Sequence, residues 1–189
     1  APDHRVVTID LPGFGSSPRP LEATSLPRMV ELVAALIEAE QMAPALLVGN
    51  CMGSNISATL DRTHPDLVAG VLAVNPLTEE TFSGGGIGFL HTMGRLAPAP
   101  TRLLRQASRR VRVPRPVAEL ALRFQLGPKG TERGLHRDAE LLACQLRPEQ
   151  VPALVDVLDD MGSYGTLDTA GAPEGRPRWI AWGERNRVL

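Results

Sequence analysis

The segment that most restricts the fold of this chain is a cysteine set between two glycines, Gly49-Asn-Cys51-Met-Gly53. An apolar run, Ala45 to Val48, precedes it, and a stretch with helical spacing follows it. A strand that passes through Gly-x-nucleophile-x-Gly directly into a helix holds the nucleophile on a sharp turn, clear of the sheet edge. The glycines leave room for the strand and the helix to cross closely. The pattern therefore predicts a strand, a tight turn at Cys51 and a helix. A turn in which a small cysteine merely packs is the alternative.

Apolar runs alternate with segments of helical spacing around this turn, which is typical of a parallel α/β sheet. Strands are expected at residues 6–10, 45–49, 68–76 and 178–186, and helices at residues 25–41 and 54–64. The first helix has Ser25 in position to cap it and Pro27 in its first turn, where no amide hydrogen is needed. The run at 68–76 is almost continuously apolar, as expected for a strand covered on both faces.

Composition suits one soluble globular domain, because 43% of the 189 residues are hydrophobic and 22% are charged. A net charge of -1 gives no overall attraction to nucleic acid or to an acidic membrane. No membrane span and no signal peptide is recognisable, so we expect a cytoplasmic protein. Its two cysteines, Cys51 and Cys144, are expected to be free thiols, and no metal site is expected. The chain does not begin with methionine, which indicates that an upstream segment has been removed or left out.

Residues 78–150 differ in character from the rest and are predicted to be a helical insertion that lies over the sheet. They contain a glycine-rich segment at 83–88, interpreted as a hinge, and seven arginines between Arg102 and Arg123. Helices are expected in "VAELALRFQL" and "DAELLACQL", and a returning helix in "PEQVPALVDVLDDM", because apolar residues recur there at helical spacing. The arginines have no interleaved aromatic residues, which favours a solvated face over a nucleic-acid groove.

Several segments together resemble the α/β-hydrolase superfamily. "DLPGFGSS" is similar to the turn after the family's fourth strand, "RTHPDLVAGVLAVNP" to the stretch after the nucleophile helix, and "PRWIAWGERNRVL" to the seventh strand and its loop. The resemblance implies a mostly parallel sheet flanked by helices, with residues 1–77 and 151–189 as the core and 78–150 as the variable cap. It also implies that N- and C-terminal strands are missing, including one between the first two strands found here. We therefore expect an incomplete copy of a larger enzyme, inactive and poorly stable by itself.

The resemblance also assigns roles to residues. Cys51 stands at the nucleophile position, where most members have serine, and the Met52 N–H is one oxyanion donor. Asn186 stands at the position of the acid, three residues after Gly183 where the family usually has aspartate. An amide can orient a histidine, as in Cys-His-Asn proteases, so Asn186 either serves in such a triad or marks lost activity. The first oxyanion donor is expected before Ala1.

The base histidine follows the acid in the family, so it is expected beyond Leu189. We assign none of the four histidines of the chain as that base: His4 and His64 are expected to be surface or packing residues, and His91 and His136 to be solvated in the cap. Glu79 and Glu80, which follow the third strand, are a less favoured source of the acid.

The predicted function is attack on an ester, thioester or related acyl carbon of a small-molecule substrate by Cys51, with no cofactor. Two alternatives remain open: an acyltransferase that uses the same turn, and a non-catalytic binding or interaction protein in which Cys51 and Asn186 result from decay of a Ser-Asp pair. Gly13-Phe-Gly15 follows a strand as in a dinucleotide-binding turn, but Pro18 stands where the third glycine belongs.

Overall fold

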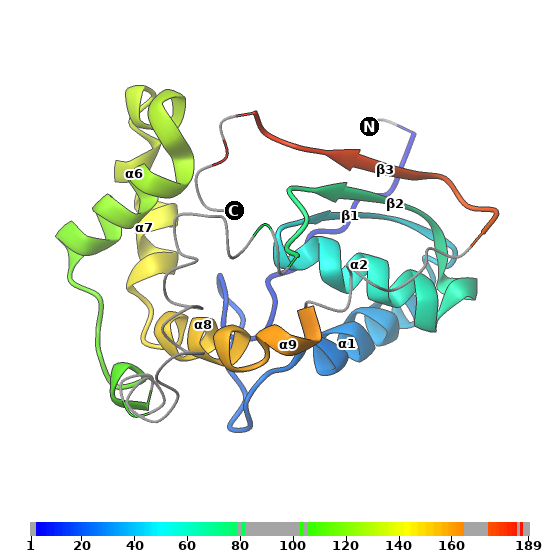
Figure 1. Cartoon of the computed structure of the whole chain (residues 1–189), viewed down its shortest axis with the longest axis horizontal. Coiled ribbons are helices and arrows are strands. Elements are labelled where there is room, and N and C mark those ends of the chain that lie inside the picture. The colour runs from blue at the N-terminus through cyan, green and yellow to red at the C-terminus, as the bar shows by residue number, and fades with distance from the viewer. Residues whose placement is uncertain are drawn as a thin grey trace.

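The computed structural model describes residues 3–78, 81, 103, 106–164, 174–184 and 186. The described strands form one parallel sheet in the order β1-β2-β3 (Figure 1). These strands are β1 (Ala45–Asn50), β2 (Val68–Val74) and β3 (Arg178–Ala181). The register places Gly49 beside Ala73 and Val74 beside Ala181, so the three strands end at a common edge. The predicted parallel α/β sheet is confirmed.

The strand predicted at residues 6–10 is wrong in the described structure. This segment has no regular secondary structure and pairs with no described strand, and Val6 and Ile9 are 70% and 39% exposed. A β-branched run favours extended backbone, but a strand also needs a partner for its backbone N–H and C=O groups. Arg5 forms an ion pair with Glu40, which ties the segment to the end of the first helix.

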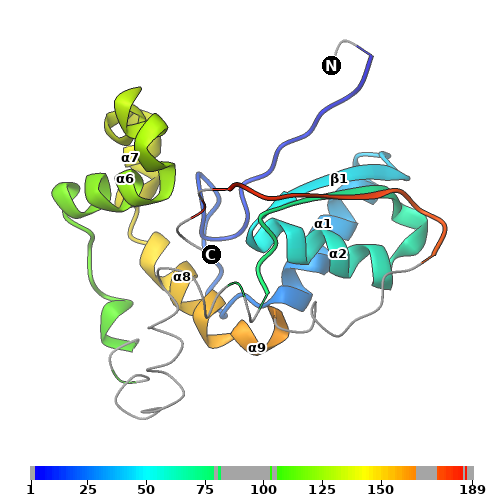
Figure 2. The same cartoon turned by 45° about the horizontal axis from the view of Figure 1, so that its top comes forward.

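Two helices, α1 (Leu26–Ala39) and α2 (Met52–Thr63), cover one face of the sheet, as both views show (Figures 1 and 2). Their buried side chains pack against those of β2 in one core. That core contains Leu26, Met29, Val30, Ala34, Ile37, Ile56, Leu60, Val68, Val71, Leu77, Met161 and Tyr164. On the opposite face of the sheet, Leu46 and Val48 are 58% and 65% exposed.

The start of α1 is capped in a way that the sequence did not predict. Pro27 lies in the first turn as expected, but the Ser25 side chain makes no capping hydrogen bond. The Leu26 N–H instead donates to Asp160 Oδ2 at 2.6 Å. A carboxylate at the positive end of the helix satisfies one of its unpaired amides and is favoured by the helix dipole. The cap therefore comes from a residue far away in the sequence.

Helices α8 (Gln150–Asp159) and α9 (Met161–Tyr164) join the core from the second half of the chain. Asp156 in α8 is 1% exposed and accepts hydrogen bonds from two guanidinium groups, Arg19 at 2.8 Å and Arg109 at 2.7 Å. A buried carboxylate is tolerated only when it is paired in this way. The network fixes α8 against the loop that precedes α1.

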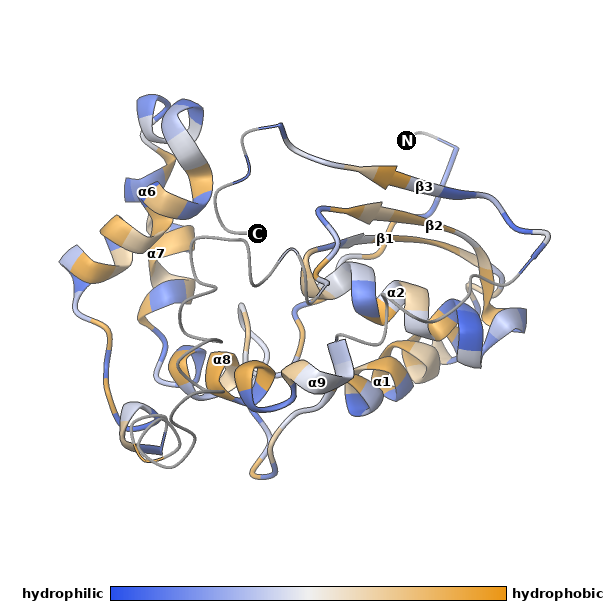
Figure 3. Ribbon diagram, viewed as in Figure 1, coloured by the Kyte–Doolittle hydropathy of each residue, from blue (hydrophilic) through white to orange (hydrophobic). Residues whose placement is uncertain are grey.

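Helices α6 (Arg115–Glu132) and α7 (Ala139–Leu146) form a second cluster around Ala118, Leu122 and Leu142. Figure 3 shows hydrophobic residues along both helices. They lie beyond the carboxyl ends of the strands and not over a face of the sheet, contrary to expectation (Figures 1 and 2). The predicted domain limits at 78 and 150 stay a prediction, and the hinge at 83–88 falls outside the described residues.

His136, expected to be solvated, is buried in this second cluster. It lies in the short 3-10 helix Leu135–Arg137, which contacts α6 and α7, and is 5% exposed. Burial lowers the pKa of its imidazole, and the nearby Arg123 and Arg137 lower it further. The tertiary packing of α6 against α7, which sequence spacing does not reveal, is what covers this ring.

Candidate active site

The site begins at the sharp connection between β1 and α2. Asn50 ends the strand, Met52 begins the helix, and Cys51 between them has φ 53° and ψ -115°. A left-handed backbone is unfavourable for a residue with a Cβ, and such strain persists only where the surroundings impose it. Here the Cys51 N–H donates to Val74 O at 2.9 Å, and Cys51 O accepts from Ser54 N–H at 3.0 Å. These bonds hold Cys51 at the carboxyl edge of the sheet.

The two glycines of the motif differ in what they contribute. A Cβ on Gly49 would lie 2.1 Å from Gly53 O, so only glycine allows strand and helix to cross at this distance. A Cβ on Gly53 would meet nothing within 4 Å, so position 53 has room for a side chain and does not require glycine. The Ser54 hydroxyl closes the crossing by sharing its one proton between Gly49 O at 2.9 Å and Val74 O at 3.0 Å. Close approach therefore depends on Gly49 and Ser54.

The Cys51 thiol is subject to two opposing effects. Burial raises its pKa, and the backbone N–H of the next residue, Met52, lowers it. The amino end of α2 also favours an anion at this position. The fully buried phenol of Tyr164 lies close enough for the charge of Cys51 to contribute, after burial and Asp160, to the raised pKa of that phenol. The surroundings thus favour a neutral thiol whose ionised form has one backbone donor.

Polar groups from all three strand ends meet beside Cys51. Asn75, which follows β2, accepts from the Gly183 N–H through Oδ1 at 2.9 Å. Its amide Nδ2 donates to Asn50 Oδ1 at 3.4 Å. The Asn186 N–H in turn donates to Gly183 O at 2.9 Å. The structure therefore brings the loop that carries Asn186 to the same edge as Cys51 and Met52.

Sequence reasoning did not single out Asn75, although a signal was present. It is a polar residue directly after an almost continuous apolar strand, "VAGVLAVNP". In parallel sheets, ligands bind outside the carboxyl ends of the strands. A side chain at the end of the strand next to Cys51 was therefore a candidate for the site from the pattern alone.

None of the described histidines lies beside Cys51. His64 follows the last residue of α2, a helix of 12 residues that begins directly after Cys51. At the rise of an α-helix this length separates the two residues by about 18 Å. His136 is buried in the second cluster, and His4 is exposed in the N-terminal segment. His91, Glu79 and Glu80 lie outside the described residues. Both cysteines are free, as predicted.

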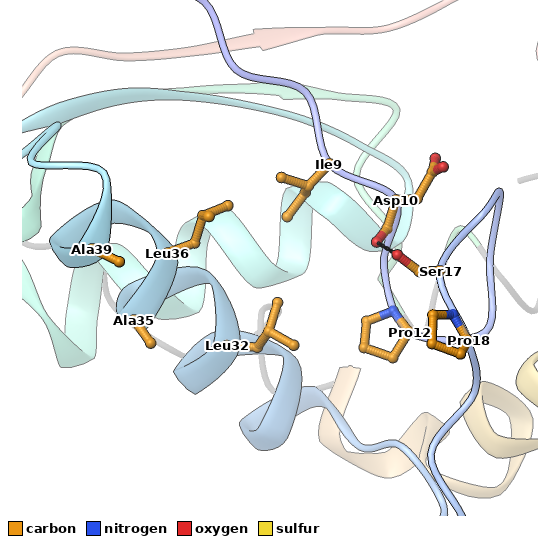
Figure 4. A pocket seen from close by; sticks show the side chains of 9 residues that line it. All are labelled: Ile9, Asp10, Pro12, Ser17, Pro18, Leu32, Ala35, Leu36 and Ala39. Atoms are coloured by element: carbon orange, nitrogen blue, oxygen red, sulfur yellow. Dashed lines mark hydrogen bonds between the residues drawn. The ribbon is translucent and has the colours of Figure 1, made fainter.

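A cavity of about 690 Å³ lies elsewhere, between residues 9–18 and α1 (Figure 4). Ile9, Pro12, Leu32 and Leu36 give it apolar walls, and the Asp10 carboxylate points away from them. Hydrogen bonds from the Ser16 N–H and hydroxyl lower the pKa of that carboxyl and fix it against the turn that follows residues 6–10. None of the predicted site residues lines this cavity, so it carries no chemistry of the proposed site.

Within the described parts of the chain, no group of three or more histidine, cysteine or acidic residues is arranged to hold a metal ion. Over the same residues, no helix is both long and apolar enough to cross a membrane.

Comparison with known proteins agrees with this architecture. The model of the α/β hydrolase fold family matches residues 1–111, which is more than half of the 189 residues. This chain belongs to the α/β hydrolase fold family.

Two solved structures show the same fold. An α/β hydrolase fold protein from Burkholderia ambifaria has a TM-score of 0.68 and 17% identity over 95% of this chain and 63% of its own. The N-acyl homoserine lactonase AidH, in an E219G mutant complexed with N-hexanoyl homoserine, has a TM-score of 0.61 and 15% identity, covering 95% of this chain and 60% of its own. At these identities the likeness concerns the fold alone.

Among curated proteins, the dihydrolipoyllysine-residue acetyltransferase component of the acetoin cleaving system of Cupriavidus necator is 33% identical over 94 residues. The match covers 49% of this chain and 25% of that protein. The chain therefore spans a quarter of the length of this relative and less than two thirds of the solved structures.

Proposed function

We propose that this chain is part of an enzyme that attacks the acyl carbon of an ester, thioester or related substrate, with Cys51 as the nucleophile. The observation that carries the proposal is the strained turn at Cys51, held between β1 and α2 by hydrogen bonds to Val74 and Ser54. Strain of this kind clusters at active sites, and a free cysteine that merely packs has no need of it. The fold family and the esterase and lactonase chemistry named among its neighbours support the same class of reaction.

In this proposal the Cys51 thiolate forms a bond to the acyl carbon, and the carbonyl π electrons move onto its oxygen. The Met52 N–H stabilises that oxyanion. Collapse of the tetrahedral intermediate expels the alkoxide or thiolate, which takes up a proton, and leaves an acyl thioester on Cys51. Water then releases the acid and restores the thiol. In this proposal Asn186 takes the acid position and orients the base that accepts the Cys51 proton.

Acyl transfer is the second candidate, since the Cupriavidus necator relative is named an acetyltransferase. The same acyl thioester on Cys51 would be attacked by an acceptor alcohol or thiol in place of water. The two candidates share every step up to that intermediate, so only the acceptor separates them.

The test uses the full-length protein with p-nitrophenyl acetate and phenyl thioacetate as substrates. We expect Cys51→Ala to abolish hydrolysis of both, and Cys144→Ala, at the second free cysteine, to leave the rate unchanged. Addition of a small thiol or alcohol acceptor distinguishes transfer from hydrolysis by its product. Equal rates for wild type and Cys51→Ala would remove Cys51 from the mechanism and favour a non-catalytic role.

A further inference from the structure

Two residues with left-handed backbone end adjacent strands at the candidate site. Cys51 has φ 53° after β1 and Asn75 has φ 45° after β2. The two turns are directly joined, because the Cys51 N–H donates to Val74 O, the carbonyl just before Asn75. Asparagine adopts this backbone more readily than other residues that have a Cβ. Asn75 therefore suits the turn. Glycine would fit the same backbone better, so the turn alone does not explain why this residue has a carboxamide side chain.

The Asn75 side chain makes two hydrogen bonds that run in opposite directions along the sheet edge. Oδ1 accepts from the Gly183 N–H at 2.9 Å, toward the end of β3. Nδ2 donates to Asn50 Oδ1 at 3.4 Å, toward the end of β1. The Gly183 amide can only donate, which fixes the oxygen on that side and the NH₂ group on the other. The carboxamide thus spans from the residue before Cys51 to the loop of Asn186.

We propose that Asn75 is a positioning residue that holds the Asn186 loop at a fixed place relative to Cys51. The inference rests on the proposed function, because it matters for chemistry only if Cys51 and Asn186 work together. A third bond supports the same placement: the Asn75 backbone N–H donates to Ala181 O at 2.8 Å. From Gly183 the chain reaches Asn186 through one turn, closed by the bond from the Asn186 N–H to Gly183 O. Asn75 therefore anchors the first residue of that turn.

The carboxamide oxygen is the part of Asn75 that this position needs. Aspartate would keep the acceptor for the Gly183 N–H, and the exposed Asn50 carboxamide can turn its NH₂ group toward the second oxygen. Glycine would keep the left-handed backbone and remove both side-chain bonds. The pair Asn75→Gly and Asn75→Asp therefore separates the side-chain bonds from the backbone turn.

The first test is amide hydrogen exchange of residues 178–186 in the full-length protein. We expect Asn75→Gly to speed exchange of this segment at least tenfold, with no change in the segment of α1, since one protecting bond is lost at Gly183. Unchanged exchange in residues 178–186 would overturn the proposal. This measurement does not depend on turnover, so it stands even if Cys51 proves non-catalytic.

The second test is a double-mutant cycle on kcat for p-nitrophenyl acetate, using Asn75→Gly, Asn186→Ala and both together. If Asn75 acts through the Asn186 loop, each single change lowers kcat about tenfold or more, and the double variant is no slower than Asn186→Ala alone. Multiplicative losses, or full activity in either single variant, would overturn the proposal. If Cys51→Ala loses activity and the losses of the other two variants multiply, the proposed function stands and only the positioning role of Asn75 is rejected.

Discussion

Replacement of Gly49 by alanine tests the crossing of β1 and α2 most directly. The added Cβ would lie 2.1 Å from Gly53 O and 2.3 Å from Gly53 C. Cβ atoms in proteins essentially never lie within 3.0 Å of another non-bonded heavy atom. These are backbone atoms, so no side chain can rotate away, and the helix would have to shift. The bonds from the Ser54 hydroxyl to Gly49 O and Val74 O oppose that shift. Overpacking costs about 1–3 kcal/mol, and a clash with backbone belongs at the upper end, about 3 kcal/mol.

Gly53→Ala is the matched control, because it adds the same methyl group on the other side of the crossing. Nothing lies within 4 Å of that Cβ. Alanine in a helix is favoured over glycine by about 0.5–1 kcal/mol. Urea unfolding, followed by the fluorescence of Trp179 and Trp182, measures both variants. With a slope of about 2 kcal/mol/M, the midpoint of Gly49→Ala falls by about 1.5 M and that of Gly53→Ala rises slightly. If the two urea midpoints agree within about 0.3 M, position 49 is no more restricted than position 53 and the steric argument is wrong.

Three further outcomes are expected. Asp61, 1% exposed and paired with Arg176 and Arg178 at 2.7 and 2.6 Å, joins α2 to β3. Asp61→Asn should therefore cost about 3 kcal/mol in urea unfolding, and a loss under about 0.5 kcal/mol would contradict the pairing. Burial raises the pKa of the Cys51 thiol, so its alkylation by iodoacetamide should reach half its maximum above about pH 8.5. Just above that pH the thiol ionises in the unfolded chain but not in the folded one, so the free energy of unfolding should fall as the pH rises. An alkylation midpoint below about pH 8 would show that the Met52 N–H lowers the pKa of the Cys51 thiol more than burial raises it. The Tyr164 hydroxyl is buried without a hydrogen-bond partner among the described residues. Tyr164→Phe should therefore be as stable as wild type or about 1 kcal/mol more stable, and a marked loss would reveal a missed partner.

Local patterns were sufficient for much of the sheet and its covering helices. The strands predicted at 45–49 and 68–76 correspond to β1 at 45–50 and β2 at 68–74, and the helical spacing of Leu26, Met29, Val30 and Ile37 predicted the buried face of α1. The glycine-flanked cysteine predicted the change from strand to helix, because that turn is encoded within a few residues. Period and turn chemistry are properties of neighbouring residues, which is why they can be read from the chain alone.

Features that depend on a distant partner could not be predicted in this way. Residues 6–10 have a strand pattern but pair with no described strand, and α1 is capped by Asp160 and not by Ser25. His136 is buried because α6 packs against α7.

The sequence by itself determined the fold family, the strand–turn–helix around Cys51 and the free state of the two cysteines. Only the tertiary structure decided that Gly49 and not Gly53 must be glycine, and that Asn75 joins Asn50 to Gly183. The physical reason is that a hydrogen bond or a steric limit between elements depends on their relative placement. That placement is set by how the whole core packs, and no short segment of the chain encodes it.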